Sequence, residues 1–156
     1  MQFSAREDVE APIDAVFRAI TDFEGFERAM LRRGAEIART DSLPAPGQGM
    51  SWQVQFDFRN RRRSAEVILS ELDIPNRMVL LAKSGGVDAD FKVDLVPLSR
   101  SRTRMDIVSE LTPTGLSARL FLQPLKLARS KMSNRFRKRV AKFAVSVEDR
   151  YQAGAR

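Results

Sequence analysis

The sequence predicts an α+β fold: a curved antiparallel sheet of about six to seven strands, two short helices and one long C-terminal helix packed across the sheet. Two observations lead to this prediction. Apolar residues recur at every second position in successive segments between residues 35 and 111, which is the spacing of half-buried strands. After Pro124 they recur at every third or fourth position as far as Tyr151, which is the spacing of an amphipathic helix.

The N-terminal third predicts one strand and two short helices. Residues 2–10 alternate between apolar and charged side chains, a pattern typical of a half-buried strand. Pro12 suits the first turn of a helix because its missing N–H has no helical partner at that position. The segment 12–33 then shows two short apolar helical patterns, which Gly25 separates.

The segment 35–111 predicts the remaining strands. The clearest strand pattern runs from Met50 to Phe58. A loop rich in proline and glycine, residues 43–49, precedes it, and a turn at Asn60 follows it. Ser84-Gly85-Gly86 is typical of a hairpin turn. Because these connections are short, successive strands are expected to pair in antiparallel order.

Residues 116–151 predict one long helix, kinked near Pro124, because a proline inside a helix removes a hydrogen bond and crowds the preceding turn. The part after Pro124 is roughly 40 Å long at 1.5 Å per residue. No other predicted element is long enough to cover the apolar face of the sheet. We therefore expect residues 1–156 to form a single domain with this helix over the sheet.

The composition excludes several kinds of active site. The 156 residues include no cysteine and no histidine. A thiol nucleophile, a Ser-His-Asp triad and a zinc site built on histidine or cysteine are therefore excluded. We predict no cofactor and no metal. No stretch approaches the roughly 20 apolar residues that span a bilayer, and the N-terminus carries acidic residues where a signal peptide is apolar. We expect a cytoplasmic protein.

The positive charge is concentrated in one stretch. The net charge is +7, from 27 basic and 20 acidic residues. Residues 111–147 contain nine basic side chains and no acidic one, so this stretch carries all of the excess. On a helical wheel, one basic flank faces away from the apolar stripe and consists of Lys131, Arg135, Lys138 and Lys142. A charge this localised favours an anionic partner, although solvated basic faces are common.

Three groups of residues resemble a known superfamily over nearly the whole chain. Ala11-Pro12 followed by Thr21-Asp22-Phe23 resembles its first strand-to-helix region. Residues 70–77, with the sequence SELDIPNR, resemble its T-E-V-D-P-P-x-R turn. Gly115, Pro124 and the basic helix that follows resemble its C-terminal helix. On these motifs the chain resembles the helix-grip, START-like SRPBCC superfamily, which includes lipid-transfer and polyketide cyclase/dehydrase proteins.

The resemblance implies a hydrophobic ligand held in a cavity between the sheet and the long helix. The ligand is expected to be a lipid, a quinone or a polyketide-like molecule. Large apolar side chains on the inward face are equally typical of an ordinary packed core. Without the resemblance, the residue types favour a packed core over a ligand cavity, and the same holds for Trp52. The candidate ligand-binding residues are Trp52, Phe56, Val67, Leu80, Phe91, Met105, Arg129, Met132 and Phe136.

Arg129 is the most unusual of these candidates because the helical wheel places it inside the apolar stripe of the long helix. A buried charge is costly unless it is paired. One hypothesis is that Arg129 binds the acidic headgroup of a ligand at the cavity mouth. More often, such an arginine pairs with a protein carboxylate or extends to solvent past Pro124.

Glu7 is a second unusual residue because it shares a strand face with Phe3 and Val9. An inward carboxylate could serve as an acid or base. A strand bulge or a pair with an arginine is the more common explanation. A cyclase/dehydratase-type enzyme is therefore the alternative function, with Glu7, Arg129 or Tyr151 in the chemistry and no catalytic residue assigned.

Two further partners follow from the basic segments. The basic C-terminal helix suits peripheral contact with an anionic membrane. The clusters 59–63 and 135–139 also suit the phosphates of RNA or a ribosome. Nucleic acid is the less favoured partner because Phe136 and Phe143 lie on the apolar stripe, whereas RNA-binding surfaces expose aromatic rings for stacking. The sequence predicts no particular oligomeric state.

Overall fold

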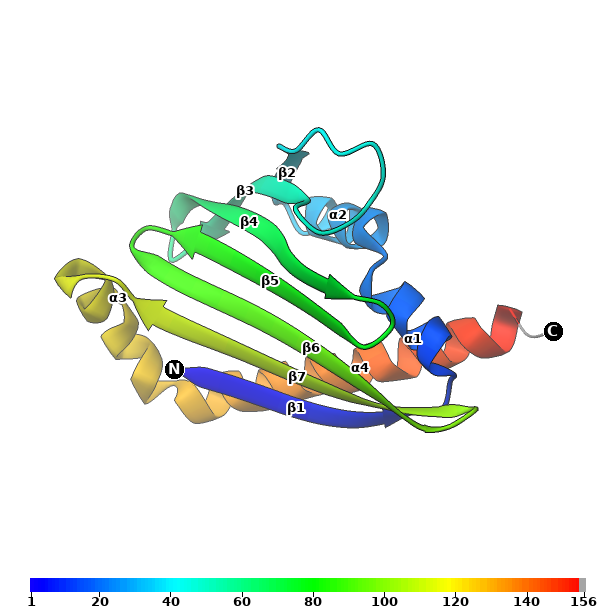
Figure 1. The fold of residues 1–156 in the computed structure, drawn as a ribbon. Helices are drawn as coiled ribbons and strands as arrows, with labels where there is room; N and C mark the ends of the chain where they lie inside the picture. Colours follow the sequence, from blue (N-terminus) through cyan, green and yellow to red (C-terminus); the bar gives the residue numbers. More distant parts are fainter. Residues whose placement is uncertain (155–156) are drawn as a thin grey trace.

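The computed structural model describes residues 1–154 and confirms the predicted α+β architecture (Figure 1). One seven-stranded antiparallel sheet has the order β1-β7-β6-β5-β4-β3-β2. The elements are β1 (Gln2–Val9), α1 (Ile13–Ile20), α2 (Phe23–Arg32), β2 (Glu36–Arg39), β3 (Ser51–Phe58), β4 (Arg61–Asp73), β5 (Arg77–Ser84), β6 (Val87–Ser99), β7 (Arg102–Pro113), α3 (Leu116–Leu127) and α4 (Arg129–Gly154).

Strands β2 to β7 follow one another across the sheet, and two-residue turns connect β3 to β4, β5 to β6 and β6 to β7. Arg59 and Asn60 join β3 to β4 with φ of 53° and 60°. Gly85 and Gly86 join β5 to β6 with φ of 54° and 78°. Positive φ at both central residues matches the right-handed twist of the flanking strands. Both predicted turns are confirmed.

The helices cover the inward face of the sheet unevenly. The long helix α4 packs mainly along β1, at one edge of the sheet, and α2 packs on β2, at the other edge. Among the strands between these edges, α1 contacts β6 and β7, and α3 contacts β7. Figure 1 shows α4 following β1, with α3 at the opposite end of the sheet from α1. Among the described residues, no helix packs as closely on β4 or β5, the strands in the middle of the sheet.

The best-packed part of the core lies beneath α1. Val9, Met105 and Val93 are almost completely buried there. Thr103 is the one buried polar side chain of the described residues, and its hydroxyl donates a hydrogen bond to the carbonyl of Ala11 at 2.8 Å. This bond ties β7 to the segment between β1 and α1, so it helps to fix where α1 begins.

The C-terminal helical region breaks at Ala128, whereas the sequence predicted a kink near Pro124. Pro124 lies inside α3, and α4 begins at Arg129. Both Pro124 and Leu120 are exposed, so water can reach the carbonyl of Leu120, which the proline leaves without its helical donor. Ala128 closes α3 with a tightened turn, in which its N–H donates to the carbonyl of Leu125 at 3.1 Å. No helix within residues 1–154 is long and apolar enough to cross a membrane.

The loop between β2 and β3 is held by one carboxylate. Asp41 accepts hydrogen bonds from the guanidinium of Arg39 at 2.6 and 2.7 Å. It also accepts hydrogen bonds from the backbone N–H groups of Leu43 and Ser51, both at 3.0 Å. These donors hold the pKa of Asp41 well below its usual range, and the hydrogen bonds from Arg39 have the largest effect.

We expect Thr103→Val to lower the free energy of unfolding by about 1–3 kcal/mol, because it preserves shape but leaves the buried Ala11 carbonyl without a donor. Urea denaturation measures the difference. Thr112→Val is the matched control, since Thr112 lies on the same strand but is exposed. Equal losses in the two variants would contradict this role for Thr103.

We expect Asp41→Asn to lower the melting temperature at neutral pH. Because the folded-state pKa of Asp41 is depressed, its contribution is present above the unfolded pKa of about 3.9 and is lost as the pH falls below it. The difference from the wild type should therefore shrink in acid. Asp57→Asn, in an exposed ion pair with Arg62, is the control for a general loss of negative charge. A difference that does not depend on pH contradicts this assignment.

Candidate functional site

One half of the inward sheet face is closely packed. Met78, Val93 and Ile107 stand side by side on β5, β6 and β7 and are all buried. Leu95 and Met105 form the next pair toward α1 and are buried as well. This half lies under α1, and Val140, Ala144 and Val147 of α4 belong to the same buried cluster.

The other half of the inward face is apolar but only half-buried. Leu80 pairs with Phe91, and Val67, Ala82 and Ala89 stand in register on β4, β5 and β6. The small side chains at Ala82 and Ala89 leave space between their larger neighbours. We name this surface the open inner patch; it consists of Phe56, Ala65, Val67, Leu80, Ala82, Ala89 and Phe91, all half-buried.

The structure separates the candidate ligand-binding residues into groups. Phe56, Val67, Leu80 and Phe91 belong to the open inner patch. Met105 is fully buried in the packed half.

Trp52 is also buried, and α2 fixes its ring. The indole Nε1–H donates to Glu27 Oε1 at 2.9 Å, and the ring lies against Phe23 at 5.4 Å between centroids. The one polar group of this indole is therefore satisfied by the protein itself, which is the arrangement expected for a core tryptophan.

The candidates on α4 lie at its N-terminal half. Met132 and Phe136 are half-buried, and the Phe136 ring contacts that of Phe3 on β1 at 6.2 Å between centroids. Arg129 is exposed, contrary to its position on the helical wheel. The helical wheel gives only the direction of a side chain: Arg129 is the first residue of α4, and no residue of this helix before Val140 is fully buried, so this end of the stripe is not covered. Within residues 1–154 Arg129 forms no ion pair.

A cluster that the sequence did not predict joins α3 to the β3–β4 turn. The guanidiniums of Arg59 and Arg63 lie over the ring of Phe121 at 4.6 and 4.7 Å. Arg59 also donates to the Phe121 carbonyl at 3.1 Å, and Phe58 meets the ring edge-on at 6.1 Å. We name these four residues the Phe121 cluster. Arg63 pairs with Phe56 in the sheet, so the cluster borders the open inner patch.

No local pattern indicates this contact, because 62 positions separate Arg59 from Phe121. The sequence suggests phosphate contact as one use of the arginines of the β3–β4 turn, beside an ordinary solvated basic face. Two of them stack instead on an aromatic ring of the same chain. A run of arginine next to a turn does not distinguish these two uses.

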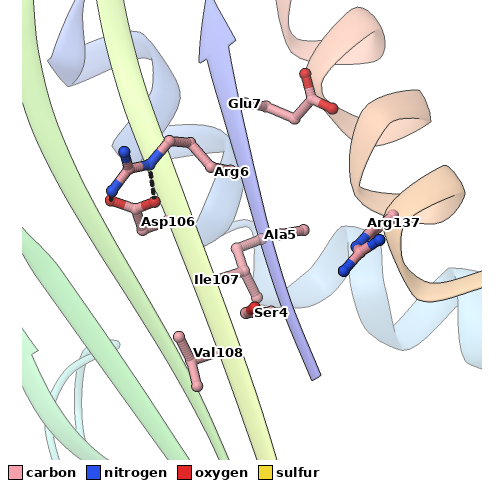
Figure 2. Close-up of a pocket in the computed structure, with 8 residues that line it drawn as sticks. All are labelled: Ser4, Ala5, Arg6, Glu7, Asp106, Ile107, Val108 and Arg137. Atoms are coloured by element: carbon pink, nitrogen blue, oxygen red, sulfur yellow. Dashed lines mark hydrogen bonds and ion pairs between the residues drawn. The ribbon is translucent and has the colours of Figure 1, made fainter. Parts of the chain in front are cut away.

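Glu7 lines a separate hollow of about 620 Å³ at the β1 edge of the sheet (Figure 2). Figure 2 shows its side chain directed toward α4, on the side of Arg137, while Arg6 turns to the other face and binds Asp106 at 2.7 Å. The pairing of β1 with β7 has no bulge, and among the described residues Glu7 has no ion-pair partner. Neither expected explanation of its inward position therefore holds.

The ionisable groups considered for catalysis do not gather at one place. Arg129 and Tyr151 lie at opposite ends of α4, about 33 Å apart at 1.5 Å per residue. Glu7 belongs to the edge strand β1, away from the open inner patch on β3 to β6. Residues 1–154 also hold no group of three or more acidic side chains positioned for a metal ion.

Comparison with solved structures shows the same fold in several proteins of low sequence identity. TTHA0849 from Thermus thermophilus is similar over 100% of both chains, with a TM-score of 0.62 and 16% identity. The ZhuI aromatase/cyclase from Streptomyces sp. R1128 has a TM-score of 0.66 and 14% identity, over 96% of this chain and 94% of its own.

Norcoclaurine synthase from Thalictrum flavum has a TM-score of 0.60 and 14% identity, over 90% of this chain and 86% of its own. No protein-family model and no curated protein sequence matches the chain. The resemblance seen in the sequence motifs is thus matched in three dimensions: the chain has the helix-grip fold of START-like and polyketide-cyclase-type proteins.

Proposed function

We propose that the protein binds a small hydrophobic molecule against the open inner patch. The observation that carries this proposal is the uneven burial of one continuous apolar face. Residues beneath α1 are almost fully buried, while Leu80, Phe91 and Val67 on the same sheet stay half-exposed. Apolar surface left on the inward side of a sheet is stabilised by an occupant that removes it from water.

Binding without chemistry is favoured over a cyclase-type reaction. A proton-transfer site needs its acid or base within hydrogen-bond reach of the reacting atom. The side chains of the open inner patch are all hydrocarbon, and Glu7, Arg129 and Tyr151 are too widely separated to act on one small molecule. The fold is shared with an aromatase/cyclase and a norcoclaurine synthase, which supports a small-molecule site and does not extend their reactions to this chain.

The polar end of the ligand would meet the Phe121 cluster. Arg63 is half-buried and adjacent to Phe56, so a carboxylate or phenolate at the edge of the open inner patch could accept from its guanidinium. In this proposal Arg63 takes the role that the sequence suggested for Arg129. The ligand is therefore an apolar molecule, such as a lipid, quinone or polyketide, with one acidic or polar end.

The test is a substitution that fills the patch. Ala82→Phe places a ring between Val67 and Ala89, so it should weaken binding of the fluorescent probe N-phenyl-1-naphthylamine by about tenfold or more. Fluorescence titration gives the dissociation constant. Native mass spectrometry of the protein incubated with a lipid extract gives the retained mass.

Lys83→Phe is the matched control because it adds the same ring one position along β5, on the exposed outward face. Its probe binding should equal that of the wild type. The melting temperatures of both variants establish that they are folded. If the wild type retains neither probe nor lipid, or if Ala82→Phe binds as well as Lys83→Phe, the proposed site is wrong.

A second prediction concerns the border of the site. Phe121→Ala removes the ring on which Arg59 and Arg63 stack, so α3 should separate more often from the β3–β4 turn. We expect faster amide hydrogen exchange in residues 116–127 and 58–63 and faster probe association. Leu120→Ala is the control, since its side chain is exposed on the same helix. Unchanged exchange in Phe121→Ala would show that the cluster does not hold α3.

A further inference from the structure

Helix α3 exposes three leucines, although one of its faces is already packed on the protein. Leu116, Leu120 and Leu127 are 74%, 63% and 93% exposed. Ala118 and Leu122 are buried, on the roughly opposite side of the helix at about 100° per residue. A helix that packs one apolar face and presents a second to solvent is not explained by the core of its own domain.

Cations surround the exposed leucines. Arg119 and Lys126 are exposed on one flank of the same helix, and Arg129 follows directly after it. On the other border of α3, Arg59 from the β3–β4 turn and Arg63 from β4 stack on Phe121. The sequence from 111 to 147 contains no acidic residue, so no carboxylate of this stretch offsets the charge.

We propose that α3 docks on an anionic lipid bilayer, with Leu116, Leu120 and Leu127 inserted at the headgroup boundary and Arg119 and Lys126 on the lipid phosphates. Exposed leucines beside basic side chains are the combination by which interfacial helices bind membranes, since apolar burial and attraction to anionic lipid add together. A soluble acidic protein would satisfy the cations but would not require leucines this exposed.

This surface differs from the basic flank of α4 that the sequence suggested. Lys131, Arg135, Lys138 and Lys142 are exposed, and the stripe on which α4 packs along β1 faces the other way. Charge without apolar side chains gives only a weak, salt-sensitive attraction. The exposed leucines therefore make α3, and not α4, the helix that contacts the bilayer. Docking through α3 does not depend on a ligand at the open inner patch.

Vesicle sedimentation tests the proposal with the whole chain. We expect binding to phosphatidylcholine vesicles that contain phosphatidylglycerol, weaker binding to phosphatidylcholine alone, and a decrease with salt. The double variant Leu120→Ser and Leu127→Ser should bind at least about tenfold more weakly. Val145→Ser is its matched control because Val145 is 55% exposed on α4.

A second pair of variants separates the two basic surfaces. Arg119→Glu with Lys126→Glu should weaken vesicle binding about tenfold or more, while Lys138→Glu with Lys142→Glu should change it much less. A tryptophan reporter locates the contact. Leu120→Trp should shift its emission to the blue on anionic vesicles, and Val145→Trp should not.

Several results would overturn the proposal. The proposal is wrong if the protein does not bind anionic vesicles at low salt. It is also wrong if the charge reversals on α3 and on α4 weaken binding equally. If the exposed leucines instead drive self-association, light scattering will show a dimer that the leucine double variant abolishes while vesicles remain unbound. If the protein binds RNA and not vesicles, with the same salt dependence, the basic residues form a nucleic-acid-binding surface and the membrane proposal is wrong.

Discussion

The pairing of β1 with β7 is the contact on which the arrangement of the other elements depends. It joins the first strand to the last through an unbroken register from Gln2↔Glu110 to Val9↔Thr103. The strand placed in this way supplies the surface along which α4 packs. Thr103 then binds the carbonyl of Ala11, just before α1, so the same pair of strands also determines where α1 sits over β6 and β7. The positions of α1 and of the buried side of α4 together decide which half of the inward face is packed and which half stays open.

Local patterns in the sequence predicted the order and type of most elements. The boundary between the two short helices was predicted wrongly at Gly25: it lies at Thr21–Asp22, and the N–H of Gly25, inside α2, donates to the capping carboxylate of Asp22. Alternation from Met50 to Phe58 and the hairpin glycines at 85 and 86 identify strands and turns because both depend on neighbouring residues alone. The break at Ala128 was not predictable in this way. Pro124 is the residue expected to break a helix. However, the carbonyl of Leu120, which Pro124 leaves without a donor, lies on the solvent side, where water can replace the lost hydrogen bond.

The candidate site was predicted only in outline. Alternation correctly assigned Phe56, Leu80 and Phe91 to the inward face, yet it could not tell an inward residue under α1 from one that stays half-exposed. That difference arises from where the helices end, which is a tertiary property. Arg129 was misplaced for the same reason, because a helical wheel gives the direction of a side chain but not the point at which the packed part of the helix begins. The Phe121 cluster could not be predicted because it is a contact between two segments far apart in the sequence. Neither segment contains a local pattern that indicates the other.

The single-residue junction at Ala128 has a consequence for how this region can be altered. At the junction the N–H of Ala128 bonds to the carbonyl of Leu125, three residues back, and the carbonyl of Ala128 accepts from the N–H of Met132 in α4, so the regular helical bonding is interrupted between the two helices. The orientation of α3 is set by its own contacts, namely Ala118 and Leu122 in the core and Phe121 on the β3–β4 turn. The outward face of the segment 116–127 can therefore diversify without shifting the register of α4 on β1. A change in the length of α3 would displace one helix or the other, because a single residue joins them.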